Sequence, residues 1–212
     1  MEGSSVIPGK DPPYPSGILM DEKSIKDYAG GVGDSNPLFT DPNYAGEAED
    51  VLRANQPIVL DVFPKSAKTL YHTDMARTVV KGRAPKQLKH MFETALHAKN
   101  AATDAMKAGV SGSEIENVCF KVLERAGYET MRSGRQIKRG LLHDVGHGVG
   151  LDSNERPTIN GLQRCVLQEH NVVTAELGLY DLGIGGVRIE DILGITRSGC
   201  TNLTETEVCL EV

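Results

Sequence analysis

The sequence predicts an α+β fold built from a strand pair, two helices and a strand-rich remainder, in that order along the chain. Residues 57–63 and 70–80 are apolar, β-branched runs separated by a turn, which is typical of a hairpin. Residues 85–127 carry the apolar spacing of two helices, and residues 141–212 alternate strand-like runs with Gly, Asn and Asp. With 212 residues, the chain is long enough for one domain with a sizeable core.

The composition is that of an ordinary globular protein and argues against two classes of partner. Charged residues make up 25% of the chain and apolar residues 39%, and the net charge is −6. Because no long run of Lys or Arg accompanies this balance, nucleic acid and anionic membranes are not expected as main partners. No apolar run approaches the roughly 20 residues that span a bilayer, and the N-terminus lacks an apolar signal core. We therefore expect a cytoplasmic protein.

The four cysteines, Cys119, Cys165, Cys200 and Cys209, show no CxxC spacing. Cys119 falls among the apolar positions of a predicted helix. This placement favours reduced, buried thiols over disulfides or a zinc site.

The first fifty residues carry no chemistry that can be assigned. Residues 1–17 contain four prolines, three glycines and three serines, so we expect a disordered lead-in. Residues 18–50 mix a short helical pattern with loop-forming sequence and are predicted to be a poorly defined N-terminal segment. The main domain is therefore expected over residues 51–212.

Each strand of the predicted hairpin contains one aspartate. Asp61 lies between Leu60 and Val62, and Asp74 lies inside the run 70–80. A carboxylate in an apolar strand is costly to desolvate without a partner. An edge strand with Asp61 facing solvent, or an ion pair with Arg77, would also explain the pattern.

Two helices are predicted next. An apolar stripe runs from Pro85 until Gly109 ends it, and a capping-box sequence at 111–114 opens a second helix that Gly127 ends. His90 and His97 lie on one side of the first helix, where solvated surface is a better interpretation than metal ligation.

Three strand-like segments follow, each with ionisable residues. His147 has a glycine on either side, which lets another backbone approach closely; alone, this pattern favours a structural histidine. Glu176 lies in the run 171–180, and Glu190 in the run 183–196, where Arg188 shares its face by strand alternation.

Together these segments contain five strand-embedded ionisable groups that could form one centre. Four carboxylates brought together would repel one another, and two divalent cations would cancel their formal charge. Oxygen-rich ligation with one imidazole suits Mn²⁺, Co²⁺, Fe²⁺ or Zn²⁺. On the residues alone, this centre and a set of scattered ion pairs are equal alternatives. The five residues are Asp61, Asp74, His147, Glu176 and Glu190.

Four segments resemble, in order, the signatures of the pita-bread metallopeptidases, a family that includes prolidase, aminopeptidase P, methionine aminopeptidase and creatinase. The resemblance covers about residues 51–212 and is strongest to the Xaa-Pro peptidase branch. It implies the pita-bread (creatinase/aminopeptidase) fold, a curved antiparallel sheet flanked by helices, with the N-terminal part abbreviated and a metallopeptidase catalytic domain over 51–212. The segments are residues 58–82, 143–157, 171–180 and 185–196.

The resemblance also implies roles for individual residues. A dinuclear centre of two divalent metal ions, with manganese favoured and cobalt, zinc or iron as alternatives, would be held by Asp61, Asp74, His147, Glu176 and Glu190. Glu176 would also act as the catalytic proton acceptor, and His143 would act in catalysis and contact the substrate. Asn154 and Arg188 would lie at the substrate-binding part of the site.

The function implied is metal-dependent hydrolysis of the Xaa-Pro bond of dipeptides or short peptides with proline second, and a homodimer is allowed. Three departures from the family pattern predict reduced activity. Asn154 replaces a histidine, Leu177 replaces a proline and would loosen the bend there, and a histidine upstream of the first strand is not recognisable. A catalytically weak or inactive pita-bread binding protein, and an enzyme acting on C–N bonds of small amidines, are the alternatives.

Overall fold

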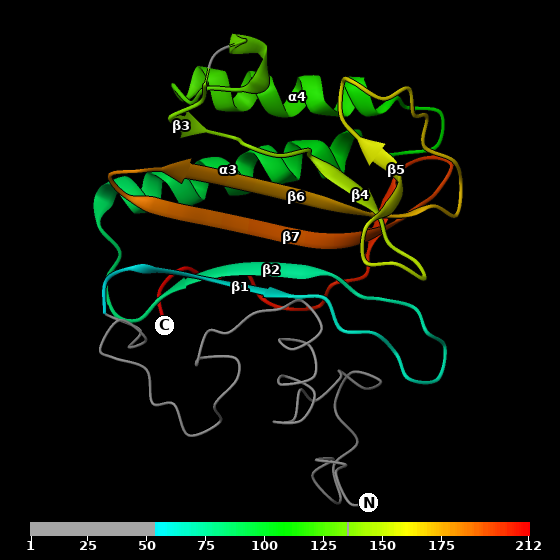
Figure 1. Cartoon of the computed structure of the whole chain (residues 1–212), viewed down its shortest axis with the longest axis horizontal. Coiled ribbons are helices and arrows are strands. Elements are labelled where there is room, and N and C mark those ends of the chain that lie inside the picture. The colour runs from blue at the N-terminus through cyan, green and yellow to red at the C-terminus, as the bar shows by residue number, and fades with distance from the viewer. Residues whose placement is uncertain (1–53, 135) are drawn as a thin grey trace, which may run out of the picture. The chain divides into compact units, whose positions relative to one another are not determined.

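The computed structural model describes residues 54–134 and 136–212 (Figure 1). The sequence predictions for residues 1–17 and 18–50 lie outside the described residues. The elements are β1 (Pro57–Val62), β2 (Met75–Val80), α3 (Lys86–Ala105), α4 (Gly112–Arg125), a 3-10 turn (Met131–Ser133), β3 (Arg139–Gly140), β4 (Gly146–Gly148), β5 (Glu155–Ile159), β6 (Val172–Asp181), β7 (Gly185–Ile195) and β8 (Cys200–Asn202).

The chain divides into two compact units, each described by itself. Most described residues, 54–63 and 71–212, belong to one unit, which contains every helix and strand named above. In the other unit the described part is residues 64–70, where the Ser66 hydroxyl accepts the N–H of Thr69 at 3.1 Å and closes a turn.

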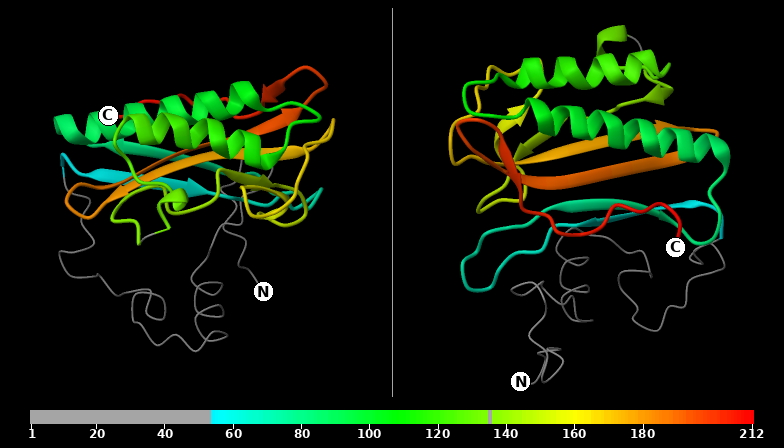
Figure 2. Two further views of the ribbon diagram at one scale, coloured as in Figure 1. Left: turned by 90° about the horizontal axis from the view of Figure 1, so that it is seen from above. Right: turned by 180° about the vertical axis from the view of Figure 1, so that it is seen from behind.

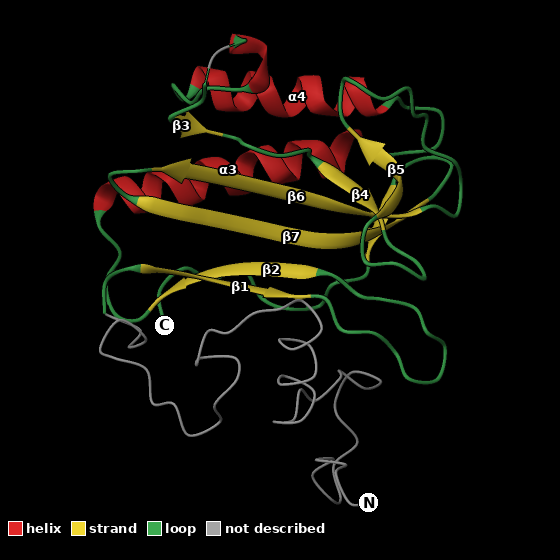
Figure 3. Cartoon of the chain, viewed as in Figure 1, coloured by secondary structure: helices red, strands yellow, loops and turns green. Residues whose placement is uncertain are grey.

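The α+β prediction is confirmed by two antiparallel sheets and a pair of helices (Figure 3). Strands β1 and β2 form a two-stranded sheet, with Asp61 opposite Ala76. The second sheet has six strands in the order β5-β4-β6-β7-β8, and β3 pairs with the far end of β6. Its long central ribbon of β6 and β7 sets Glu176 directly opposite Glu190.

The two helices lie on one face of the larger sheet, and α3 packs against β6, β7 and α4 (Figure 2). The predicted capping box opens α4, where the Ser111 hydroxyl and Glu114 satisfy one another's backbone N–H. The first helix ends at Ala105, earlier than expected, because Met106 adopts an extended conformation. Leu88, Met91, Ala95, Ala98 and Ala102 form its buried stripe. Neither described helix is both long and apolar enough to span a membrane.

His90 and His97 are exposed on α3, as predicted. The cysteine prediction is correct for Cys119, which is buried, whereas Cys165, Cys200 and Cys209 are only partly buried; all four are free thiols.

The second strand is shorter than the sequence suggested. It begins at Met75, so Asp74 lies immediately before β2 instead of inside it. The N–H of His72 donates to the carbonyl of Gly150 at 2.8 Å, which joins this part of the chain to the loop after β4 instead of to β1. Asp74 is thereby directed towards the strands that carry the other predicted ligands.

Candidate metal centre

The five predicted metal ligands line a single cavity of about 210 Å³. They come from the hairpin, from β4 and from the β6–β7 ribbon, which are distant in sequence. The cavity is lined by Asp61, Phe63, Asp74, His147, Ser153, Asn154, Glu176, Arg188 and Glu190.

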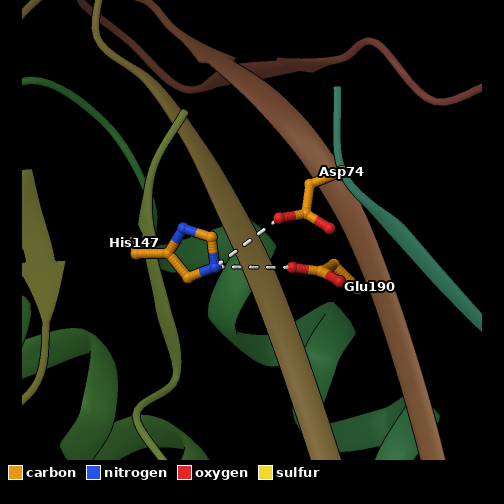
Figure 4. Close-up of side chains that lie close together, drawn as sticks. All are labelled: Asp74, His147 and Glu190. Carbon is orange, nitrogen blue, oxygen red and sulfur yellow. Dashed lines mark ion pairs between the residues drawn. The ribbon is translucent and has the colours of Figure 1, made fainter. Parts of the chain in front are cut away.

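Three of these residues form a tight, buried cluster (Figure 4). One ligand atom from each of Asp74, His147 and Glu190 lies within 4.8 Å of the other two. His147 Nε2 is 3.8 Å from Asp74 Oδ2 and 3.8 Å from Glu190 Oε1. Atoms that share one ion at about 2.0–2.2 Å lie at most roughly 4.4 Å apart, so these separations fit a divalent cation.

The backbone around His147 presents its Nε2 to the carboxylates. Nδ1 lies 3.1 Å from the carbonyl oxygen of Gly148. Because a carbonyl oxygen can only accept, this hydrogen bond places a proton on Nδ1 and leaves Nε2 free to donate its lone pair to a metal. The flanking glycines are required by close approach: a Cβ at Gly146 would lie 2.1 Å from the carbonyl oxygen of Thr174, and one at Gly148 would lie 2.5 Å from that of Arg156. The GHG pattern therefore has a local steric cause.

Glu176 and Asp61 lie beside this cluster and are joined by Arg188. Glu176 Oε2 is 4.0 Å from His147 Nε2, and its Oε1 is 3.3 Å from Arg188 Nε. Arg188 Nη1 donates to Asp61 Oδ2 at 2.5 Å. The alternative in which Asp61 pairs with Arg77 is therefore wrong. The other alternative, an exposed Asp61 on an edge strand, agrees with the structure, because β1 belongs to a two-stranded sheet and Asp61 is exposed there.

The electrostatics of the cluster favour a bound cation. Burial, reinforced by Glu176, Asp74 and Asp61, raises the pKa of Glu190 to about 9. Burial also raises the pKa of Asp74 to about 6, against the opposing effect of His147. Among the described residues, Glu190 Oε1 is one of three buried side-chain polar atoms without a hydrogen-bond partner. Mutually repelling carboxylates, one of them with a buried oxygen that has no hydrogen-bond partner, together with an imidazole nitrogen are a donor set that suits a divalent metal.

His143 lies next to the cluster, with one nitrogen available. Its Nδ1 lies 2.8 Å from the carbonyl of Asp144, and its Nε2 is buried without a hydrogen-bond partner in the described structure. Gly178 leaves the space that the ring occupies, since a Cβ there would lie 2.4 Å from His143 Nε2 and 2.6 Å from the Tyr180 hydroxyl.

Sequence reasoning missed Tyr180. Arg188 Nη2 donates to its hydroxyl at 2.8 Å, and burial raises the pKa of the phenol. Alternation along β6 puts Tyr180 on the same face as Glu176, and this signal could have identified it.

Asp191 was also missed, because its side chain points away from the cluster. It is 1% exposed, accepts from Arg77 Nη2 at 2.6 Å and from Asn202 Nδ2 at 3.2 Å, and pairs with Lys99 Nζ. Adjacent buried carboxylates at 190 and 191 therefore have opposite surroundings: Glu190 faces other acids, and Asp191 faces two cations.

Two of the departures from the family pattern are visible. Asn154 is exposed at the cavity, in the position where a histidine was expected. Leu177 is 1% exposed and pairs with Ile189 within an unbroken β6, so the expected loosening of the chain at this residue is not observed.

Comparisons with known proteins identify the family of the chain. Residues 27–197 match the model of metallopeptidase family M24, a match that begins upstream of residue 51. An Xaa-Pro dipeptidase from Pyrococcus furiosus is 35% identical over 137 residues, which cover 65% of this chain and 37% of the relative. One from Lactobacillus delbrueckii subsp. lactis is 30% identical over 169 residues, or 80% of this chain and 43% of the relative. The chain thus spans less than half the length of these relatives.

Solved structures support the same fold. An X-Pro aminopeptidase from Thermotoga maritima matches with a TM-score of 0.67 and 28% identity, over 76% of this chain and 43% of that one. The prolidase from Pyrococcus horikoshii matches with a TM-score of 0.66 and 32% identity, over 74% and 42%. These neighbours confirm the pita-bread prediction, and the family match covers most of the sequence. The chain belongs to metallopeptidase family M24.

Proposed function

We propose that the protein is a metal-dependent exopeptidase that hydrolyses the Xaa-Pro bond of dipeptides or short peptides. The observation that carries the proposal is the buried cluster of Asp74, His147 and Glu190, extended by Glu176 and Asp61 on one cavity. The two relatives above are named Xaa-Pro dipeptidases, which supports the substrate class.

These five residues would hold two divalent cations, for which manganese is the first choice. When bound, the cations would supply Lewis-acid polarisation of a carbonyl oxygen and a lowered pKa for water. Cobalt, zinc and iron suit the same ligands.

The chain's own groups would move the protons and orient the substrate. The Glu176 carboxylate would accept a proton from the attacking water and return it to the leaving proline nitrogen. Arg188, held between Asp61 and Tyr180, orients that carboxylate through the 3.3 Å contact to Oε1. His143, whose Nε2 has no hydrogen-bond partner among the described residues, would contact the substrate near the scissile bond and stabilise its carbonyl oxygen.

The test is Mn²⁺ binding together with hydrolysis of Ala-Pro and of a longer Xaa-Pro peptide. We expect the wild type to bind Mn²⁺ and cleave, and Asp74→Ala to do neither, because it removes one member of the buried cluster. Asp104→Ala, an exposed aspartate on α3, is the matched control and should behave as the wild type. Metal binding without cleavage above the Asp74→Ala background would contradict the enzymatic function.

A second candidate function, a weak or inactive metal-binding member of the family, is favoured by Asn154 alone. An amide can donate a hydrogen bond but cannot carry positive charge. The absence of activity with normal Mn²⁺ affinity would support this candidate. The cytoplasmic location and the lack of a nucleic-acid or membrane partner stay predictions, and a homodimer stays an allowed arrangement.

Restoring histidine at position 154 should raise turnover of Ala-Pro. A charge-assisted hydrogen bond exceeds a neutral one by about 1 kcal/mol, which corresponds to roughly 5-fold in rate. Steady-state kinetics of Asn154→His should show a higher kcat that falls at high pH as the imidazole loses its proton. Asn154→Gln controls for side-chain size, and an equal gain in both variants would contradict the charge argument.

A further inference from the structure

The candidate ligands belong to two separate sheets. Asp61 and Asp74 lie on the β1–β2 hairpin or directly before β2, whereas His147, Glu176 and Glu190 lie on the six-stranded sheet. Strand β2 runs beside β7 and contacts it, yet no backbone ladder joins the two sheets in the part of the chain that the structure describes (Figure 1). Something other than strand pairing must therefore set the distance between the two halves of the centre.

The edge of β7 that faces β2 is satisfied by side chains. Thr78 Oγ1 accepts the N–H of Arg188 at 2.7 Å and donates to the carbonyl of the same residue at 3.0 Å. Two residues further along this edge, the carbonyl of Glu190 accepts from Arg77 Nη1 at 2.6 Å. A single hydroxyl thus performs both roles that a neighbouring peptide group would perform in a sheet.

Thr78 is placed to act on the centre without touching a ligand. Thr78 is 1% exposed and lies on β2, the strand that directly follows Asp74. The residue whose backbone it holds, Arg188, is also the one whose guanidinium contacts Asp61 from the hairpin and Glu176 from the larger sheet. The hydroxyl therefore fixes the backbone from which that bridge extends.

We propose that Thr78 is a positioning residue that holds the hairpin carboxylates in register with the ligands on β4, β6 and β7. The inference rests on the proposed function, because it assumes that these residues bind divalent metal. The proposed role belongs to the hydroxyl of Thr78 and not to the volume of its side chain. Two substitutions of similar size should therefore separate loss of the hydrogen bonds from loss of packing. Thr78→Val keeps the shape and removes the hydroxyl, whereas Thr78→Ser keeps the hydroxyl.

Calorimetric titration with Mn²⁺, well below the unfolding temperature, tests the proposal. We expect the Kd of Thr78→Val to rise by roughly 10-fold, the lower end of the loss seen when groups outside the ligand shell are removed. Thr78→Ser should restore the affinity of the wild type. Thr94→Val is the matched control, since it removes a buried hydroxyl that donates to the carbonyl of His90 within α3, and it should leave the Kd unchanged.

The outcomes separate this inference from the function on which it rests. A wild type that binds no Mn²⁺ would overturn the proposed function and the inference with it. Normal binding by the wild type and equal binding by Thr78→Val would overturn the role of Thr78 alone. If Thr78→Val does not fold, amide hydrogen exchange of the wild type decides, because the Arg188 N–H must be protected by its bond to Thr78. Rapid exchange at that amide would contradict the proposal.

Discussion

Asparagine in place of Asp191 should lower the free energy of unfolding by about 3–5 kcal/mol, because removing one member of a buried ion pair leaves its partners uncompensated. Arg77 and Lys99 are 6% and 7% exposed in their side chains and share this carboxylate. The neutral amide would leave both cations in a site from which water is excluded. Urea unfolding would measure the loss, and we expect the slope of the free energy of unfolding against urea concentration to stay unchanged.

Asp181→Asn is the control for the Asp191 prediction. Asp181 also lies on the β6–β7 ribbon and pairs with a cation, Arg139, at 3.2 Å, but the arginine side chain is 47% exposed. Solvent screens such a pair, so we expect a loss of less than about 1 kcal/mol. Equal effects of the two substitutions would show that the burial of Asp191 and of its two cationic partners does not matter.

At the neighbouring residue we expect the opposite result: Glu190→Gln should stabilise the metal-free protein at neutral and alkaline pH. The pKa of Glu190 is raised from 4.5 to about 9, since burial and the nearby carboxylates disfavour its charged form. A raised pKa contributes stability that is present in full below the unfolded value near 4.5 and is lost as the pH rises through 9. Glutamine cannot ionise and avoids this loss.

Thermal unfolding in a chelator, at pH 5 and at pH 8, measures the effect. We expect the advantage of Glu190→Gln over the wild type to grow with pH, to on the order of 2–4 kcal/mol at pH 8. Saturating Mn²⁺ should reverse the order, because metal stabilises only a protein that binds it. A variant that is less stable than the wild type at pH 8 without metal would contradict the electrostatic account of the site.

The sequence contained enough information to find most of the candidate site. A carboxylate in an apolar strand is conspicuous because strand period and hydrophobicity are both local properties, and this identified Asp61, Glu176 and Glu190. Asp74 was identified as well, although it lies just outside its strand. The capping box and the stripe on α3 were predicted on equally local grounds.

The partners of these carboxylates were not predictable, because they depend on which strands meet. Arg77 and Arg188 are both arginines on strands, and only the packing of β2 beside β7 decides that Asp61 pairs with Arg188. The alternation of side chains along the strand placed Asp191 on the face opposite Glu190. It could not show that Lys99 of α3 lies on that face and pairs with Asp191. Long-range pairing of this kind is a property of the tertiary fold.

Stability of the fold alone gives no reason for a carboxylate at position 190. We expect glutamine at this position to make the metal-free protein more stable, and a single-base change of the codon is enough to introduce it. Selection for stability alone would therefore remove the carboxylate. At position 191 the same kind of change would be purged, because the fold depends on it. The two strand neighbours would thus be kept for different reasons: selection for a stable fold would keep Asp191, whereas only a requirement for a bound cation would keep the carboxylate of Glu190.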